Sequence, residues 1–549
     1  MNPGRPGHRA PLLWLLLPLM AGLAAGKVCA APGVGLLASA ALMAVAAMLL
    51  AVDNRWFAPH AWPVFLSLTV MLAGAAYFQL RLNRPSAWET LPPREARLRL
   101  RVERAFPKTT GGKRTTGFAV VTGTEAHLRD LAGQRLYFSL QLAPGRPPPL
   151  RSTEIEAIGL LEPLTRLPRR EGFDAYIVNA GMTFKFTRGR LLGEVAPPSR
   201  YRRFCHAAER RFHAILGIGL ADQPALAAIL RAMMLGQKQE MAEEQQELFM
   251  HSGTMHLFAI SGLNVTAIAL SVQTLLILLR LPRLVAAGAG LTALWLYVDI
   301  TGTSPSAVRA FLMCALFIGS FSLRRPGNAL AALAASALLI LLLEPMQLFS
   351  ASFQMSYGIV AALLLLGWPL AGWLQARWPL FADLPEATWG WRRQLANWMW
   401  RALLGMLGIG LAAALVSTVS SIQFFQLFTP GALLINLLLI PLSTLVIGAG
   451  FLSLLCGLAG CAAGSVIFNH AGALLLWLMD AALRSALAVP GVYQTAQFRT
   501  AWLGPAFLAG LMALCLAGYA WHWRRERGGF WPPFVLTALL LILGVKFAS

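Results

Sequence analysis

Apolar stretches of about 20 residues recur along almost the whole chain, and no other feature limits its possible folds as strongly. Three lie near residues 11–28, 33–52 and 61–80, and about ten more begin near residues 257, 285, 307, 329, 353, 398, 431, 462, 501 and 533. Because lipid offers no hydrogen bonds to a peptide backbone, each stretch is predicted to be a helix. The chain, with 57% hydrophobic residues among 549, is therefore predicted to be a polytopic α-helical membrane protein of about 13 spans.

The first apolar stretch follows Arg5 and Arg9 and leads to an Ala-rich region near Cys29. That pattern also fits a signal peptide that is cleaved after translocation. We assign residues 1–80 to about three N-terminal transmembrane helices. Cleavage of the first would not alter the topology inferred below.

Residues 81–198 have a different pattern, in which runs such as "RLRLRVERAF", "GFAVVTGT" and "RLYFSLQLA" alternate apolar and polar residues between Gly and Pro clusters. About five short strands without intervening helices predict a small inserted β domain, either an OB-like barrel or a fragment of a sandwich. Basic residues outnumber acidic ones in this domain. The candidate DNA-binding residues are Arg97, Arg99 and Arg101, which alternate along one strand face, with Lys113 and Arg114 further on, although a solvated strand face would look the same.

The segment "RYRRFCHAAERRFHAIL" places apolar residues at helical spacing opposite several arginines. It predicts an amphipathic helix that lies on anionic headgroups or braces the β domain against the membrane. Residues 199–253 are accordingly assigned to amphipathic helices, and residues 254–549 to a second polytopic transmembrane domain.

Arg residues gather in four short loops between the later spans, at residues 280–283, 323–328, 389–397 and 523–529. Placing all four in the cytoplasm satisfies both the positive-inside rule and the alternation of the spans between them. Traced back through the first three spans, this scheme puts the amino terminus inside and makes the β domain extracytoplasmic.

The segment "HLFAISGLNV", residues 256–265, carries polar side chains into a predicted span, where they are costly unless they have partners or a function. Polar residues of several other spans fall in the same outer half of the bilayer. This favours an outward-facing vestibule, although small and polar residues also serve helix packing. The candidate lining residues are His256, Ser261, Gly262, Asn264, Asp299, Ser306, Arg309, Gln354, Ser356 and Asn436.

Three of these residues have a further expected role. Gly262 weakens a helix interior, so the span is expected to unwind there. Asp299 and Arg309 flank one outer loop and are expected to form an ion pair that fixes it.

The six cysteines and nine histidines are scattered, without CxxC, HxH or HExxH spacing. No disulfide framework, metal site or cofactor is predicted, and no catalytic residue is assigned. The formal net charge of +22 admits contact with anionic lipid or with a polyanionic cargo such as nucleic acid.

Several of these segments resemble the ComEC family of DNA-internalisation proteins, the inner-membrane channels of natural competence. "MLGQKQE" and "LFMHSGTMHLFAISGLNV" are similar to its signature, an LLG followed by a Gly-x-x-His-Leu-[Leu/Phe]-Ala-[Ile/Val]-Ser-Gly-Leu-His-Val block. Further similar segments are "YVDITGTSPSAVRAFLM", "SFQMSYGIVAAL", "INLLLIPLSTLV" and, at the end of the β domain, "REGFDAYIVNAGM".

The resemblance implies a multi-pass protein of the bacterial inner (cytoplasmic) membrane that passes single-stranded DNA inward, with an OB-like domain receiving the strand. Aromatic faces such as Phe118, Tyr137 or Phe186 could stack bases there, or could instead be barrel core. The resemblance also implies partners, namely a separate nuclease, a DNA receptor, a cytoplasmic motor and membrane lipid, and a homo-oligomer also fits.

Two departures from the family pattern bear on these expectations. Asn264 stands where the signature has its second histidine, which puts a titratable role at that position in doubt. Many members carry a carboxy-terminal metallo-β-lactamase-like domain, and no HxHxDH motif follows the last span, so we expect a form without that domain.

Two other functions remain open. An intramembrane hydrolase would use Ser261 as nucleophile and His256 as base. Residues five apart point roughly 140° from each other on a regular helix, so that pairing would need distortion, and we favour a protein that is not an enzyme. A transporter of another polyanion or of a lipid-linked substrate could use the same architecture.

Overall fold

The computed structural model describes residues 10–28, 33–52, 58–81, 91–107, 114–143, 147–165, 172–258, 262–322, 328–385, 389–524 and 529–547. The described chain folds as two compact units. One comprises residues 7–208 together with 334–350, and the other comprises residues 209–333 and 351–549. We describe each unit by itself.

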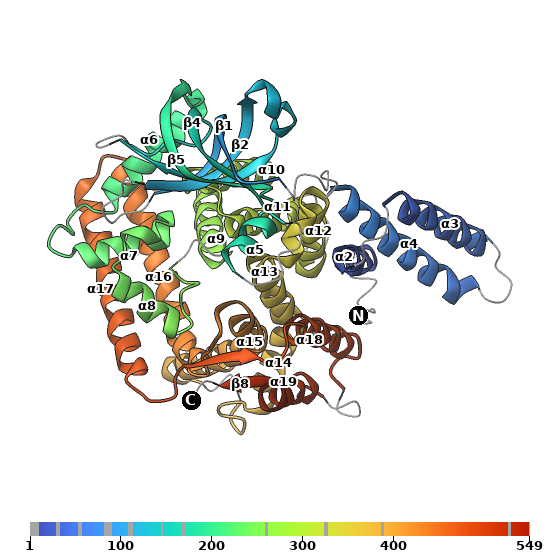
Figure 1. Ribbon diagram of the computed structural model, residues 1–549. Coiled ribbons are helices and arrows are strands. Elements are labelled where there is room, and N and C mark those ends of the chain that lie inside the picture. Colours follow the sequence, from blue (N-terminus) through green and yellow to red (C-terminus); the bar gives the residue numbers. More distant parts are fainter. Residues whose placement is uncertain are drawn as a thin grey trace. The chain divides into compact units, whose positions relative to one another are not determined.

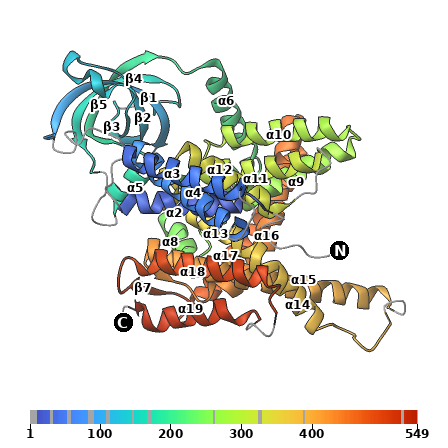
Figure 2. The ribbon, with the colours of Figure 1, turned by 90° about the vertical axis from the view of Figure 1, so that its right-hand side faces the viewer.

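Three helices begin the first unit, α2 (Leu13–Val28), α3 (Gly33–Val52) and α4 (Ala58–Arg81), and Figures 1 and 2 show them side by side. The chains of α2 and α4 approach so closely that a Cβ atom on Gly22 would lie 2.0 Å from the carbonyl oxygen of Met71. Only glycine permits this contact, which explains the small residue at that position of α2.

A closed five-stranded barrel follows, with its strands curling around one axis in Figure 2. The strand order is β1-β2-β3-β5-β4, and every pairing is antiparallel except that of β3 with β5. Alternate residues of each strand fill the interior, where Leu100, Phe138 and Phe186 are completely buried. The strands are β1 (Arg94–Pro107), β2 (Arg114–Thr124), β3 (Arg135–Gln141), β4 (Glu154–Pro163) and β5 (Phe184–Ala196).

Two short elements connect the strands, η2 (Ala126–Leu131) before β3 and α5 (Phe173–Asn179) before β5. The same unit includes most of α12 (Ala329–Leu343) and all of η4 (Pro345–Phe349). Met346 of η4 packs against the small core of α5, and the ring of Phe349 meets that of Phe78 edge-on at 5.8 Å. The predicted amphipathic helix is present as α6 (Arg200–Ile215).

The second unit is almost entirely helical. Its largest core joins α7, α9, α10, α11, α16 and α17. The three-stranded sheet β6-β7-β8 brings together segments before α16, after α17 and after α19. The elements are α7 (Pro224–Leu235), η3 (Lys238–Glu240), α8 (Glu243–His251), α9 (Gly262–Leu278), α10 (Arg283–Ile300), α11 (Pro305–Ser322), α13 (Ala351–Ala362), η5 (Leu363–Gly367), α14 (Trp368–Arg377), α15 (Trp391–Phe425), β6 (Leu427–Phe428), α16 (Ala432–Leu458), α17 (Ala462–Leu487), β7 (Gln494–Phe498), α18 (Leu503–Ala520), α19 (Trp531–Leu543) and β8 (Val545–Phe547).

Eight helices of the described chain are long and apolar enough to cross a membrane. They begin at Trp62, Arg283, Pro305, Ala351, Trp391, Ala432, Ala462 and Leu503. This confirms a multi-pass helical membrane protein but not the expected number of about 13 spans. The other expected spans are shorter apolar helices, namely α2, α9, α12, α19 and, within α3, the segment Gly33–Leu49. At 1.5 Å per residue, a helix of fewer than 18 residues reaches less than the roughly 30 Å of a hydrocarbon core, whereas hydropathy also counts apolar residues beyond the helix ends.

Candidate functional site

A buried turn after α8 positions His256, the first polar residue of the signature. Gly253 adopts a φ of +71°, and a Cβ atom there would lie 2.9 Å from the Thr429 hydroxyl oxygen and 3.1 Å from Cβ of Ala432, so glycine is required. The carbonyl of Gly253 accepts a hydrogen bond from Nδ1 of His256 at 3.2 Å. Since a carbonyl only accepts, Nδ1 carries the proton, and Nε2 of this exposed side chain has no partner within the described residues.

Aromatic packing and a hydroxyl pair hold this turn. The rings of Phe249 and Phe258 stack at 3.6 Å, and the hydroxyls of Ser252 and Thr254 lie 2.7 Å apart in full burial. Ser261 falls outside the described residues, so its geometry relative to His256 is not described. Gly262 is the first residue of α9, and a Cβ atom there would meet Ala310 of α11 at 3.8 Å.

Asn264 has a defined structural partner on α7. Its side chain is 1% exposed, and its Nδ2 donates to the carbonyl of Met233 at 2.8 Å. The hydroxyl of Tyr297 on α10 donates to the next carbonyl, that of Met234. The last four carbonyls of a helix lack partners within the helix, so these two side chains cap the buried end of α7. An amide donor meets this need without a titratable group, which accounts for asparagine at this position.

Arg309, on α11, is buried, with 1% of its surface exposed. Its Nη2 donates to the Ser352 carbonyl at 2.9 Å, to the Ser352 hydroxyl and to the Ser356 hydroxyl at 3.0 Å, which ties α11 to α13. The expected ion pair with Asp299 does not occur among the ion pairs of the described residues, although Asp299 is itself buried at the end of α10. The hydrogen bonds of Arg309 within the described residues are therefore made to neutral groups.

The remaining candidates are partly brought together. Asn436 follows Ala432 by one turn of α16, on the face that meets the Gly253 turn, and its buried Oδ1 has no hydrogen-bond partner within the described residues. Gln354 is half-buried on α13, between the two serines that hold Arg309, and Ser306 is half-buried at the start of α11. The structure thus joins Ser356 to Arg309, while one vestibule lined by all ten residues stays a prediction.

The arginines predicted to bind DNA do lie on an exposed face of β1, but they have acidic partners on β4. Arg97 contacts Glu156 at 3.0 Å, Arg99 contacts the same carboxylate at 3.9 Å, and Arg101 contacts Glu154 at 2.7 Å. The hydrogen bond with Arg97 lowers the pKa of Glu156. Three cations therefore face two anions. Arg114 begins β2 in an exposed position, and Lys113 lies outside the described residues.

A row of aromatic rings crosses the outer face of the barrel, and we call Phe106, Phe118, Tyr137, Phe173 and Tyr176 the aromatic row. Successive ring centroids lie 5.3, 6.4, 5.0 and 6.3 Å apart. The first three rings come from β1, β2 and β3, and the last two from α5.

The two ends of the aromatic row differ in exposure. Phe118 and Tyr137 pack against the small core beneath α5, whereas Phe173 and Tyr176 are 49% and 59% exposed. Lys185 lies 5.7 Å over the Phe173 ring, although it also pairs with Asp174 at 3.0 Å. Phe186, named with Phe118 and Tyr137 from the sequence, is instead interior core of the barrel.

Arg104 lies at the other end of the aromatic row, 5.0 Å over the ring of Phe106. Burial lowers the pKa of Arg104, and Arg151 nearby lowers it further. Arg104 and Arg151 thus lie close enough on the barrel for the charge of one to affect the other.

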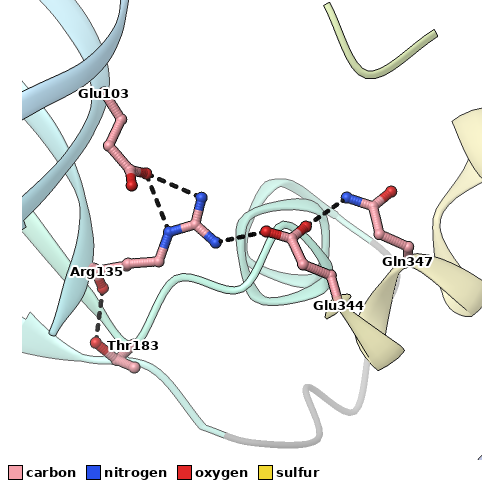
Figure 3. A network of polar contacts seen from close by, with 5 residues as sticks. All are labelled: Glu103, Arg135, Thr183, Glu344 and Gln347. Atoms are coloured by element: carbon pink, nitrogen blue, oxygen red, sulfur yellow. Dashed lines mark hydrogen bonds and ion pairs between the residues drawn. The ribbon is translucent and has the colours of Figure 1, made fainter. Parts of the chain in front are cut away.

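A polar network fixes the barrel to the end of α12 within the first unit (Figure 3). The Arg135 guanidinium contacts Glu103 at 2.9 Å and Glu344 at 3.1 Å, and Gln347 donates to the second oxygen of Glu344 at 3.0 Å. Burial alone lowers the pKa of Arg135, but the two carboxylates outweigh it and raise the pKa above its ordinary value. Sequence reasoning missed both this network and the exposed rings of α5, because neither has a periodic signal.

Comparison with known proteins identifies one family. A family model described as "Competence protein" matches residues 233–525. ComE operon protein 3 of Bacillus subtilis (strain 168) is 31% identical over 142 residues, which are 26% of this chain and 18% of that protein. Competence protein ComA of Neisseria gonorrhoeae is 30% identical over 232 residues, which are 39% of this chain and 31% of that protein. The chain thus aligns with less than a third of either relative. No solved structure matches it.

Proposed function

The chain belongs to the Competence protein family, and from this premise we propose that it serves DNA uptake as a channel for single-stranded DNA in the bacterial inner membrane. In this proposal the second unit forms the conduit and the barrel receives the strand on the outer side. The role is transport, and we assign no catalytic chemistry to the chain.

The buried position of Arg309 is the main support for a DNA conduit in the second unit. A buried arginine in a helix that is apolar enough to span a membrane costs about 2.5–3.5 kcal/mol on insertion scales, and it normally pairs with an opposite charge or with backbone carbonyls. Arg309 is held only by a carbonyl and two hydroxyls among the described residues. Since no carboxylate among the described residues pairs with it, this charge suits the passage of a phosphate chain, which supplies a negative charge transiently.

The geometry of the second unit supports an outward mouth around this charge. The free Nε2 of His256, the buried Oδ1 of Asn436 and the serines beside Arg309 come from different elements. We propose that these residues, with Ser261, Gly262, Asp299, Ser306 and Gln354, line or shape the vestibule. Asn264 contributes by fixing α7 behind it.

Barrel topology supports an OB-like receiver. Five strands in the order 1-2-3-5-4, closed into a Greek-key barrel, are the architecture that binds oligonucleotides on its strand faces and loops. Binding of single strands without sequence preference needs cations for the backbone and rings for the bases. The aromatic row supplies rings, and Arg104 and Lys185 supply cations beside it.

We further propose that a separate nuclease, a DNA receptor and a cytoplasmic motor act with this chain, that membrane lipid surrounds it, and that it can form homo-oligomers. The four Arg-bearing loops support the orientation with the barrel outside. A transporter of another polyanion would use the same features, so competition by anionic polymers other than DNA separates the two functions.

DNase-resistant uptake of labelled DNA tests the proposal, in a naturally competent bacterium whose own member of the family is deleted. The chain is restored as wild type, Arg309→Lys or Arg309→Gln, with membrane levels compared by a tag. We expect the wild type to restore uptake, Arg309→Lys to retain part of it and Arg309→Gln to lose it at equal protein level, because only lysine keeps the charge.

Ser356→Ala is the comparison variant, since it removes one hydrogen bond to Arg309 but not the charge, and we expect it to lose less uptake than Arg309→Gln. Equal uptake with lysine and glutamine at position 309 would show that the residue only ties α11 to α13. No rescue by the wild type would count against DNA transport itself.

A further inference from the structure

The turn between α16 and α17 brings two cysteines together, and neither belongs to a sequence motif described above. It has the sequence "CGLAGC", residues 456–461. The amide of Cys461 donates to the carbonyl of Cys456 at 2.8 Å, and Gly460 between them adopts a φ of +82°. This is the hydrogen bond of a Schellman motif, which places the side chains at its two ends in contact.

Gly464 provides an independent measure of how close the two thiols lie. A Cβ atom on Gly464 would lie 2.8 Å from Sγ of Cys456 and 3.3 Å from Sγ of Cys461. Both sulfurs therefore lie next to the same position, that of a Cβ atom on Gly464. The distance between the two sulfurs is at most the sum of these two distances. Disulfides need Cα atoms about 4.4–6.8 Å apart, and the hydrogen bond between the two backbones together with the shared position of the two sulfurs favours closure of the bond.

Accessibility favours reaction at this pair. Cys461 is exposed and Cys456 is half-buried, whereas Cys205 and Cys515 are buried and Cys314 is half-buried in the interior of α11. Reactivity of a thiol requires access, so an oxidant reaches Cys461 first. Glycine at position 464 leaves space beneath the sulfurs that any larger residue would fill.

We propose that Cys456 and Cys461 are a reversible dithiol–disulfide pair that staples the α16–α17 turn. The oxidant is a small disulfide such as oxidised glutathione. The Cys461 thiolate attacks one sulfur of it, giving a mixed disulfide and one free thiol. The Cys456 thiolate then attacks the Cys461 sulfur and releases the second thiol. Two protons and two electrons leave the pair, and both electrons reduce the small disulfide to two thiols.

The compartment sets the resting form. In the proposed topology α16 enters from the outer side, so this turn lies in the cytoplasm, where thiols are kept reduced. The pair is then a dithiol at rest and closes when the thiol pool is oxidised. The proposal stands on the turn geometry alone and does not depend on DNA transport.

Thiol counting on the purified full chain tests the pair. The other four cysteines, Cys29, Cys205, Cys314 and Cys515, are replaced by serine. The protein is incubated with graded oxidised glutathione, and remaining thiols are labelled with a maleimide polymer that adds one gel shift each. We expect both labels to disappear together in monomeric protein and to return with a reductant.

A displaced pair is the matched control, with Cys461→Ser combined with Ala462→Cys on the next, also exposed, position. The new cysteine lies on the first residue of α17, one position beyond the one held by the hydrogen bond to the Cys456 carbonyl, so we expect its closure to need at least tenfold more oxidant. The proposal is overturned if both cysteines of the native pair are still labelled at concentrations of oxidised glutathione that form mixed disulfides. It is also overturned if the native pair closes no more readily than the displaced pair. Loss of label only in disulfide-linked dimers would also refute it.

Discussion

Removal of the two exposed rings of the aromatic row should weaken binding of single-stranded DNA without changing its dependence on salt. The change is Phe173→Ala combined with Tyr176→Ala. Both residues lie on α5 and both are about half exposed, so a base can reach them. Stacking engages the face of a base and carries no charge, whereas phosphate contacts set the salt dependence.

The magnitude follows from how much of each ring is free. Replacing a stacking aromatic by alanine typically costs about 1–3 kcal/mol per base. Phe173 already has Tyr137 at 5.0 Å on one side and Lys185 at 5.7 Å over its ring, so the lower end of that range applies to it. We therefore expect about 1 kcal/mol for each ring and about 2 kcal/mol for the pair, which weakens Kd roughly 30-fold since 1.4 kcal/mol is tenfold.

Fluorescence anisotropy of a labelled oligothymidylate, titrated with the full chain in lipid nanodiscs at several salt concentrations, measures this Kd. Phe173→Leu with Tyr176→Leu keeps apolar area but removes the π faces, and should lose nearly as much affinity. Tyr201→Ala is the location control, because Tyr201 is an exposed ring with a cation, Arg202, 5.3 Å over it but lies outside the aromatic row. Thermal unfolding of each variant checks that α5 remains folded.

An unchanged Kd in the double alanine variant would refute the reasoning, as would an equal loss in Tyr201→Ala. A loss that vanishes at high salt would mean that the rings act by positioning Lys185 and not by stacking.

Three further predictions concern other parts of the chain. Glu154→Gln with Glu156→Gln removes the acidic partners of Arg97, Arg99 and Arg101, so the Kd for oligothymidylate should fall. In a plot of log Kd against log salt concentration, the slope should steepen by about 0.7 for each new phosphate contact. An unchanged slope would mean that this face of β1 does not bind DNA. Asn264→Ala leaves the buried Met233 carbonyl without a donor and should cost about 1–3 kcal/mol in the free energy of unfolding, seen as a lower Tm in detergent, whereas Asn264→His keeps a donor and should lose less. Burial lowers the pKa of Lys238 below its ordinary 10.5, so the unfolded chain binds this proton more tightly than the folded chain does. Lys238→Met should therefore raise the free energy of unfolding at neutral pH, and this gain should shrink as the pH rises through the folded pKa towards 10.5. A gain that is independent of pH would contradict this reasoning.

The periodicity of the sequence predicted the helices and strands of this protein better than it predicted which residues of other elements they contact. Alternation along β1 correctly placed Arg97, Arg99 and Arg101 on one exposed face. It could not reveal Glu154 and Glu156 opposite them, because cross-strand neighbours depend on the barrel register and lie more than 50 residues away. The same limit applies to Phe118 and Phe186, since alternation gives two faces but not which one is inside.

The polar residues of the spans show a second limit. Composition and topology selected Arg309 and Asn264, and both are buried at helix contacts. Their partners are backbone carbonyls and serines, and such groups occur in every segment, so no pattern marks them. The expected partner of Arg309, Asp299, was chosen by charge, whereas packing of α11 against α13 decides the contact that forms.

The capped end of α7 has a consequence for how the chain enters the membrane. Eight of the twelve residues of α7 are buried, and its last carbonyls take their hydrogen bonds from Asn264 and Tyr297, which the ribosome makes 31 and 63 residues later. Until those residues arrive, α7 is too short to span and has carbonyls that lipid cannot satisfy. The last turn of α7 therefore obtains these two hydrogen bonds only after α9 and α10 have been made, so the buried position of α7 is completed after both helices have packed against it.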